Sequence, residues 1–267
     1  MIDFNITLIQ NKPQRDVKKS LQDIENLIEK SVKSNNDLFM LPESSYHPYE
    51  LPAVRHLAQE FDYALDFFIK IAKKYKIYLC TGSIFVPEDS GIYNRAYLIN
   101  PEGEIILTHD KCHLYDINFQ GLRIRESRFV NSGKGLKNID TPLGKIGMLI
   151  CYDIRFPESM RSLGDCDIVL IPAAFNQVSG PAHWDLLFRT RAVENQCYVA
   201  ACSPARDDDA VYVAYGHSML VDPWGSVIVE AGQEAQVITT QILHKRLNEV
   251  RGKLPLSKHR RPEIYSI

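Results

Sequence analysis

The feature that most constrains the fold is an alternation of short apolar segments with longer amphipathic ones near the N-terminus. Residues 4–9, 37–41 and 77–85 are apolar runs with the length of strands. Between them, segments from about 13 to 34 and from about 53 to 74 repeat apolar residues at three- and four-residue steps, which predicts amphipathic helices. This strand–helix–strand–helix–strand order predicts crossover units with parallel pairing.

The rest of the chain follows a different pattern. Pairs of short apolar segments flank three turn sequences that each contain a proline and a glycine, at 100–103, 141–144 and 222–225. Each pair predicts two strands joined by a turn, so the sheets should be mixed. This number of strands is too large for one open sheet with helices on both faces. We therefore predict an α/β fold in which two mixed sheets pack face to face with helices outside, a four-layer α-β-β-α sandwich.

Composition sets the size of the folded unit. The chain has 267 residues, of which 45% are apolar and 24% are charged, and no Pro/Gly/Ser-rich linker interrupts its apolar segments. A chain of this length buries roughly three quarters of its unfolded surface, so no disulfide is needed for stability. We expect a single domain over residues 1–267, with a basic C-terminal tail from about residue 243.

The same composition excludes several classes of protein. A net charge of −2 argues against a nucleic-acid partner, which requires clustered Lys and Arg. Asn5, Gln10 and Asn11 interrupt the N-terminal apolar run, and no segment approaches membrane-spanning length. We therefore predict no signal peptide and no membrane association, and we expect a cytoplasmic protein.

Cys151 differs from the other five cysteines in its position. Most cysteines here are expected to be small buried residues, because none forms a C-x-x-C pair. The apolar run Ile146–Ile150, in contrast, ends at Cys151, and Pro157 and Glu158 then open a predicted helix. The thiol should therefore face the open end of a buried strand, where ligands bind in sheets with parallel strands.

Two further polar residues directly follow apolar strand segments. Glu43 follows the second predicted strand, and Lys111 follows the strand after the 100–103 turn. Alone, Glu43 could cap a loop and Lys111 could be a solvated turn residue. Together with Cys151, they predict a carboxylate, an ammonium and a thiol that converge on one pocket.

This trio has the chemistry of nucleophilic catalysis. A thiol attacks only as a thiolate, so Glu43 would accept the proton of Cys151, which requires a carboxylate with a raised pKa. Lys111 would favour the thiolate and stabilise an oxyanion, and the backbone N–H of Tyr152 is the natural second donor. Glu43 would then protonate the leaving nitrogen and activate the water that hydrolyses the thioester.

The same residues carry a family resemblance. The segments Leu41–Glu43, Asp110–Leu114 and Ile150–Glu158 resemble the three signature motifs of the nitrilase (carbon–nitrogen hydrolase) superfamily, in order and spacing. The resemblance covers essentially the whole chain and is nearest to the omega-amidase branch. Supporting segments are Ala174–Asn176, Gly180–Trp184, Arg189–Gln196, Ser203–Arg206, Tyr215–Ser218 and Val221–Gly225.

The resemblance implies an α-β-β-α sandwich that pairs into homodimers. It implies hydrolysis of a small-molecule amide through a cysteine acyl-enzyme, without a metal or another cofactor. Glu43, Lys111 and Cys151 match its Glu-Lys-Cys triad. Glu126 is similar to the family's second glutamate, which orients the lysine and the substrate; the alternative is a plain loop carboxylate.

The substrate class also follows from the resemblance, because omega-amidases act on monoamides of short dicarboxylates. Arg155 is our candidate for binding the substrate carboxylate with its planar fork. The alternative is an internal ion pair with Asp153 or Glu158. Phe175 and Tyr46 are expected to line the pocket wall. Segments 44–49 and 116–128 match the branch only loosely, which leaves the exact substrate open.

Several competing functions are weighed against this hypothesis. A metal could bind the crowded side chains of residues 109–116, but their spacing fits no familiar zinc pattern. Cys151 could pair with His183 or His217, although both are expected to have structural roles. The triad could also serve nitrile or N-carbamoyl hydrolysis, or the protein could be a non-catalytic dimeric scaffold.

Overall fold

The computed structural model describes residues 2–32, 38–119 and 121–265, which form two six-stranded sheets and a small hairpin. In the first sheet the order is β14-β1-β2-β3-β4-β5, and the central strands β1, β2 and β3 are parallel. The strands of this sheet are β1 (Phe4–Gln10), β2 (Leu38–Met40), β3 (Tyr78–Glu88), β4 (Gly91–Ile99), β5 (Ile105–Asp110) and β14 (Gln236–Ile242).

The second sheet repeats this plan. Its order is β13-β12-β11-β10-β9-β8, with parallel strands at β9, β10 and β11 and antiparallel strands on both sides. The predicted mixed sheets are therefore confirmed. The strands are β8 (Asn138–Thr141), β9 (Gly144–Met148), β10 (Ile168–Pro172), β11 (Tyr198–Cys202), β12 (Met219–Val221) and β13 (Val227–Glu230).

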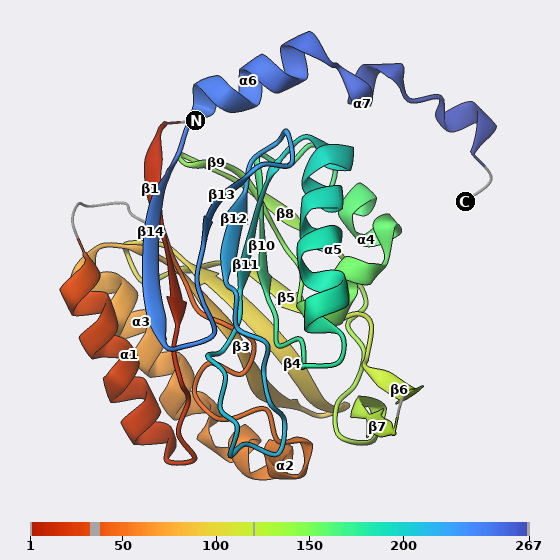
Figure 1. Cartoon of the computed structure of the whole chain (residues 1–267). Coiled ribbons are helices and arrows are strands. Elements are labelled where there is room, and N and C mark those ends of the chain that lie inside the picture. Colours follow the sequence, from red (N-terminus) through yellow and green to blue (C-terminus); the bar gives the residue numbers. More distant parts are fainter. Residues whose placement is uncertain (1, 33–37, 120, 266–267) are drawn as a thin grey trace.

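Helices cover the outer face of each sheet, which completes the predicted four layers (Figure 1). Helices α1 (Val17–Ser31) and α3 (Phe61–Tyr75) pack on the first sheet. Helices α4 (Pro157–Ser162) and α5 (Gly180–Asn195) cover the second. The second predicted helix, from about residue 53 to 74, is interrupted: a short α2 (Val54–Leu57) and a 3₁₀ turn precede α3.

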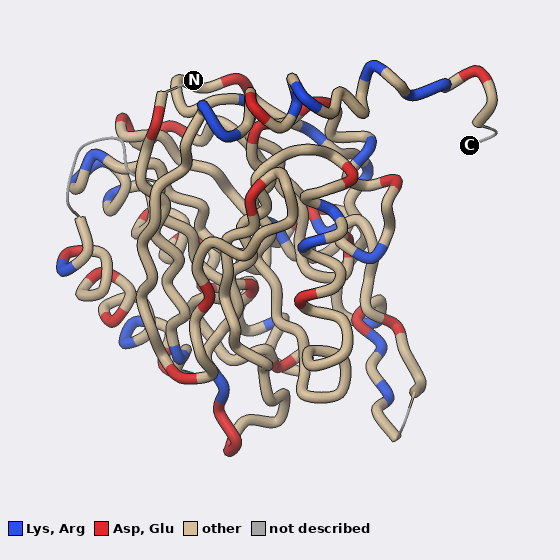
Figure 2. Tube along the Cα trace, turned by 45° about the horizontal axis from the view of Figure 1, so that its top comes forward, with Lys and Arg blue, Asp and Glu red and all other residues tan. Residues whose placement is uncertain are grey.

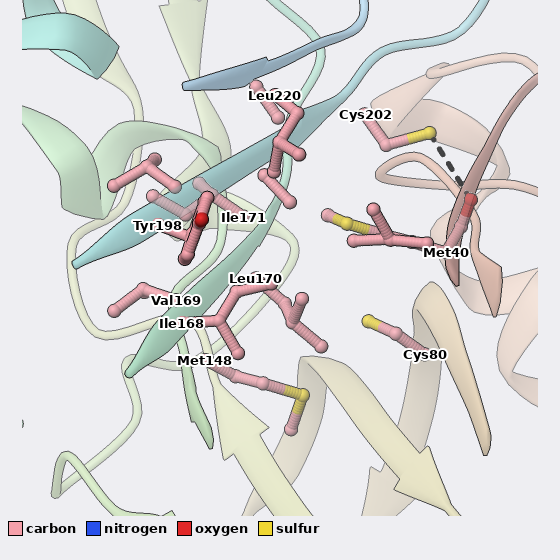
Figure 3. Packing of buried hydrophobic residues seen from close by; sticks show 14 of the residues in the cluster. Met40, Cys80, Met148, Ile168, Val169, Leu170, Ile171, Tyr198, Cys202 and Leu220 are labelled. Atoms are coloured by element: carbon pink, nitrogen blue, oxygen red, sulfur yellow. Dashed lines mark hydrogen bonds between the residues drawn. The ribbon is translucent and has the colours of Figure 1, made fainter. Parts of the chain in front are cut away.

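The hydrophobic core follows the two-residue periodicity of strands. In β2, Leu38 and Met40 point into the cluster between the sheets, whereas Phe39 points into the cluster under α1 and α3. Figure 3 shows Met40 and Cys80 of the first sheet facing Met148 and Leu170 of the second. Face-to-face packing of the sheets therefore determines how the ends of their strands meet.

Three of the strands, β6 (Asp116–Phe119), β7 (Leu122–Arg125) and β14, were not predicted from the sequence. Strand β14 pairs antiparallel with β1, and only two of its side chains, Ile238 and Ile242, are buried. The hairpin of β6 and β7 projects from the body and buries little apolar surface (Figure 1). Both lack the strongly apolar runs that mark the other strands.

The C-terminal segment begins close to the predicted residue 243. Helix α6 (His244–Lys253) buries Leu247 and Val250, and α7 (Leu256–His259) extends beyond the sandwich (Figure 1). Arg251 anchors α6 through an ion pair of 2.8 Å with Asp167.

Charge is mixed along the chain, as Figure 2 shows, with basic residues interspersed among acidic ones. Within the described residues, none of the helices combines the length and hydrophobicity that a bilayer crossing requires.

Candidate active site

The three predicted polar residues converge beyond the ends of their strands. Glu43 lies three residues after β2, Lys111 directly follows β5, and Cys151 lies three residues after β9. Glu43 and Lys111 are each only 1% exposed, and Cys151 is 7% exposed. The Nζ atom of Lys111 donates a hydrogen bond of 2.9 Å to Oε1 of Glu43, and the Cys151 thiol lies near enough to Glu43 for each group to shift the pKa of the other. The two sheets thus bring a thiol, a carboxylate and an ammonium together in one buried site.

Cys151 has an unusual backbone conformation. Its φ of 45° lies in the left-handed region, which costs a non-glycine residue about 1–3 kcal/mol. Strand β9 ends at Met148, and after two further residues a 3₁₀ turn runs from Cys151 to Arg155. The backbone N–H of Asp153 donates to the carbonyl of Ile150, and the Asp153 carboxylate accepts a hydrogen bond from the N–H of Ile150. This reciprocal pair holds the sharp turn that presents the sulfur.

Glu126 is the second carboxylate of the site. It is fully buried and its Oε2 lies 2.9 Å from Nζ of Lys111. The Tyr49 hydroxyl donates to its Oε1 at 2.9 Å, and the Tyr115 backbone N–H donates to its Oε2 at 2.7 Å. Glu126 is therefore a second anionic partner that holds the ammonium of Lys111 in place beside Glu43.

Glu43 has one further partner, Asn94. Its side-chain amide donates a hydrogen bond of 3.0 Å to Oε1 of Glu43, the oxygen that also accepts from Lys111. Asn94 lies in β4 and is 1% exposed. Two donors on Oε1 leave Oε2 as the oxygen with lone pairs to spare.

Burial dominates the electrostatics of the site. It raises the pKa of the Glu43 carboxyl, a shift that Lys111 opposes and the negative Glu126 reinforces. Burial also raises the pKa of the Cys151 thiol well above its usual value, and the neighbouring Glu43 adds to this. Burial disfavours the charged form of Lys111, but Glu126 and Glu43 outweigh it, so the pKa of Lys111 is raised. The ammonium is therefore permanent, whereas Glu43 is a carboxylate suited to accept a proton.

A small cavity opens beside the sulfur. Its wall combines aromatic rings, one arginine and small residues: Tyr115, Cys151, Tyr152, Arg155, Ala174, Phe175, Ser179 and Tyr212. Ala174 follows β10, and its backbone forms a hydrogen bond to Cys151. The cavity thus lies at the carboxyl ends of parallel strands, where open sheets bind ligands.

Arg155 lines this cavity, and its guanidinium packs against aromatic rings. Its guanidinium is 4.9 Å from the ring centroid of Phe175 and 5.6 Å from that of Tyr152. Its Nη1 contacts Nδ1 of His183 at 3.1 Å. Within the described residues no carboxylate lies within 4.0 Å of Arg155, so the internal ion pair with Asp153 or Glu158 is not formed.

Phe175 lines the cavity as predicted, whereas Tyr46 does not. Tyr46 is fully buried in the cluster under α1 and α3, and its hydroxyl accepts a hydrogen bond from the backbone N–H of Phe85. The chain reverses at Ser44, whose φ is 54°, and this directs Tyr46 back into the core.

The histidine-rich segment around Lys111 has a structural arrangement. One ligand atom each of His109, Cys112 and Asp153 lies within 4.8 Å of the others. The Asp153 oxygens, however, already accept hydrogen bonds from both imidazoles, of His109 and His113. Burial raises the pKa of Cys112 to about 11, which disfavours the thiolate that a metal would need. The donor set does not fit a metal site.

The histidines of the Cys–His alternative are occupied elsewhere. His183 contacts Arg155, and His217 pairs with Glu230 at 2.9 Å.

Several residues of the site were missed in the sequence. Asn94 could have been noticed as a polar residue inside an apolar strand. Tyr212 carries no such signal, because it comes from an irregular segment; its hydroxyl donates to the carbonyl of Ala174, and its ring packs 5.0 Å from that of Tyr49.

This fold and this site define a class. The chain belongs to the carbon–nitrogen hydrolase family, whose model matches residues 5–252. It is therefore a hydrolase that acts on amides.

Individual relatives sharpen this assignment. The chain is 38% identical to omega-amidase NIT2 of Danio rerio over 273 residues, covering 100% of this chain and 98% of the relative. It is 36% identical to omega-amidase NIT2 of Homo sapiens, with the same coverage.

Solved structures agree. Nit3 of Saccharomyces cerevisiae, a member of branch 10 of the nitrilase superfamily, superimposes with a TM-score of 0.86 at 35% identity, covering 97% of both chains. The NitFhit protein of C. elegans superimposes with a TM-score of 0.90 at 30% identity, covering 99% of this chain and 66% of that one. The nitrilase-like fold is thereby shown.

Proposed function

We propose that this protein hydrolyses the terminal amide of short dicarboxylate monoamides, such as 2-oxoglutaramate or succinamate, to the acid and ammonia. The observation that carries the proposal is the position of Arg155, which lines the same cavity as Cys151 and has no acidic partner among the residues that the structure describes. A guanidinium is the group best suited to bind a substrate carboxylate through two hydrogen bonds. The small size of the cavity beside Cys151 favours short substrates.

The first half-reaction forms a thioester. Oε2 of Glu43 accepts the proton of Cys151, and the thiolate attacks the amide carbon. Nζ of Lys111 and the backbone N–H of Tyr152 stabilise the oxygen of the tetrahedral intermediate. The C–N bond then breaks, and Glu43 donates its proton to the leaving nitrogen, which departs as ammonia.

The second half-reaction restores the enzyme. Glu43 accepts a proton from water, and the hydroxide attacks the thioester carbon. The C–S bond breaks, the dicarboxylate leaves, and Glu43 returns the proton to the sulfur of Cys151. Lys111 keeps its charge throughout, because Glu126 and Glu43 both favour its ammonium form. Side chains and water suffice for every step, so the mechanism needs no cofactor.

Ammonia release from a panel of amides, nitriles and N-carbamoyl compounds tests the proposal. We expect release from succinamate and 2-oxoglutaramate, and its loss in Cys151→Ala. Arg155→Leu should lower kcat/KM on these monoamides about 100-fold, since it removes a charged hydrogen-bonding partner, and should affect an uncharged amide much less. Arg161→Leu is the matched control, because it removes an arginine of the following helix, α4. It should change kcat/KM on neither substrate.

The outcomes separate the alternatives. Equal losses on charged and uncharged amides would remove Arg155 from substrate binding. Release only from nitriles or N-carbamoyl compounds would replace the substrate class, and release that survives Cys151→Ala would overturn the cysteine mechanism. A protein inactive on every compound, with an unreactive Cys151, would be a scaffold.

We also infer a homodimer that uses the outer face of α5. Leu186 and Val193 of this helix and Trp224 in the adjacent turn are exposed at 61%, 42% and 57%. Arg189 ties helix and turn together by donating to the carbonyl of Gly225, so these side chains share one surface. Exposed apolar side chains gathered in this way are typical of interfaces. Light scattering should give twice the mass of one chain for the wild type, and the mass of a single chain for Leu186→Glu.

A further inference from the structure

A second buried carboxylate lies directly behind the nucleophile. Asp153 is fully buried, and its two oxygens accept four hydrogen bonds. Oδ2 accepts from the Ile150 backbone N–H at 3.1 Å and pairs with Nε2 of His109 at 2.8 Å. Oδ1 accepts from the His113 backbone N–H at 2.9 Å and pairs with Nδ1 of the same residue at 2.8 Å. Every lone-pair position of this carboxylate is thus in use.

The four donors come from two segments that are far apart in the sequence. His109 and His113 each lie two residues from Lys111, one before it and one after it. Asp153 lies two residues after Cys151, in the same 3₁₀ turn. One carboxylate therefore joins the segment that carries the ammonium to the turn that carries the thiol.

We propose that Asp153 is a positioning residue: with His109 and His113 it forms a clamp that sets the separation between Nζ of Lys111 and Sγ of Cys151. This inference rests on the proposed Glu43–Lys111–Cys151 mechanism and adds a role that the mechanism does not itself require. Asp153 is not among the residues that line the cavity beside Cys151. It acts through the two segments that it joins.

Three features of the clamp support a positioning role. The left-handed backbone at Cys151 persists only where surrounding contacts over-determine it, and Asp153 supplies the contact to Ile150, the residue just before. Within the described residues, Asp153 is the one hydrogen-bond partner of the His109 side chain, because the buried Nδ1 of His109 has no hydrogen-bond partner. His113 is fixed further by stacking on Phe156 at 3.8 Å between centroids.

The same residues are poorly suited to the other use that their composition allows. A cation bound by Asp153, His109 and Cys112 would have to displace hydrogen bonds from oxygens that are already saturated. The thiol of Cys112 donates to the carbonyl of Asp110, which a thiolate ligand could not do. Saturation of the carboxylate favours a fixed clamp over a binding site.

The test measures the reactivity of Cys151 in the absence of substrate and, separately, kcat and KM for the hydrolysis of succinamate. The rate of alkylation by iodoacetamide is recorded against pH in the full-length protein and in Asp153→Asn, which keeps the side-chain shape. Asp222→Asn is the matched control, because Asp222 is also buried and accepts backbone N–H groups of a turn, but in the β12–β13 hairpin. The groups that face the thiol in both proteins are Glu43, Lys111, Tyr115 and Tyr212.

We expect Asp153→Asn to shift the alkylation profile to higher pH and to lower kcat about 100-fold with little change in KM, since a misplacement of about 1 Å has effects of this size. Asp222→Asn should lower the melting temperature and leave the alkylation profile unchanged. His113→Gln retains a side-chain donor and should give a smaller shift in the same direction. If Asp153→Asn does not fold, His113→Gln decides the question by the sign of its shift.

The inference is overturned if Asp153→Asn, or His113→Gln in its place, lowers the melting temperature but leaves the alkylation profile and kcat unchanged. That result differs from failure of the proposed function. In the latter case Cys151→Ala would retain ammonia release, whatever the behaviour of Asp153.

Discussion

Two clusters of hydrogen bonds, one around the buried carboxylate of Glu43 and one around that of Asp153, behave in opposite ways. Glu43 and Asp153 are 1% and 0% exposed, so burial penalises both negative charges. Burial raises the pKa of Glu43. For Asp153 the hydrogen bonds from His109 and His113 outweigh burial and lower the pKa. Equal burial therefore yields a proton acceptor in one cluster and a permanent anion in the other.

The difference lies in the number of donors that each carboxylate receives. Asp153 accepts four hydrogen bonds, two of them from backbone N–H groups. Glu43 accepts from Lys111 and Asn94 on one oxygen and competes with Glu126 for the same ammonium. A carboxylate whose lone pairs all accept hydrogen bonds stays ionised and is suited to hold two segments together. A carboxylate with unused lone pairs can exchange protons.

The largest effect on activity should come from removing the carboxylate of Glu43, which has unused lone pairs. Glu43→Gln keeps an acceptor for Lys111 but cannot take the thiol proton, so we expect ammonia release to fall about 10⁴-fold. Steady-state assays on succinamate measure this, with circular dichroism to show that the variant is folded. A loss no larger than that of Asp153→Asn would break the comparison, because both carboxylates would then be merely structural.

The next effect concerns the competing negative charge. Glu126 raises the pKa of Glu43, so Glu126→Gln should move the acid limb of the kcat/KM profile to lower pH. Lys111 should also lose orientation, and activity at neutral pH should fall about tenfold to 100-fold. The pH–rate profile of the variant checks both expectations. An acid limb displaced to higher pH would show that Glu43 does not set it.

A smaller effect of opposite sign is expected at Asn94. Its amide stabilises the ionised form of Glu43, so Asn94→Ala should raise the pKa of Glu43 further and move the acid limb upward, by about one pH unit. Activity at neutral pH should fall only a few-fold. The same profile measured in Asn100→Ala, whose side chain bonds to an exposed turn, is the control. If the acid limbs of the kcat/KM profiles coincide in wild type and Asn94→Ala, Asn94 does not influence the pKa of Glu43.

The smallest effect is on the free energy of unfolding, whose dependence on pH should differ between variants of Asp153 and of Glu43. The pKa of Asp153 is lowered in the folded state, so its contribution is present above the ordinary value of 3.8 and is lost as pH falls below it. Asp153→Asn should therefore be destabilised by about 2 kcal/mol at pH 6, and the difference should shrink progressively as pH falls from 3.8 toward the lowered pKa.

Glu43 should show the reverse slope. Its pKa is raised, so its contribution is present below the ordinary value of 4.5 and is lost as pH rises through the raised pKa. The free energy of unfolding of Glu43→Gln relative to wild type should thus increase with pH. Urea titrations at several pH values measure both differences, and parallel curves for the two variants would contradict the assignment of opposite pKa shifts.

Local sequence patterns determined much of this protein. Apolar runs and helical periodicity placed most strands and helices within a few residues, because side-chain period depends only on neighbouring positions. The positions of Glu43, Lys111 and Cys151 at strand ends followed for the same reason. The segments around them were sufficient to identify the family.

Tertiary structure decided what those residues contact. Strand β14 exists because β1 lies beside it, and Tyr46 joins the core because the chain reverses at Ser44. Asp153 was a possible partner of Arg155 in the sequence, but two imidazoles from a segment some forty residues away occupy it instead. Hydrogen-bond partners and pKa shifts depend on groups that only folding brings together, and no local pattern records them.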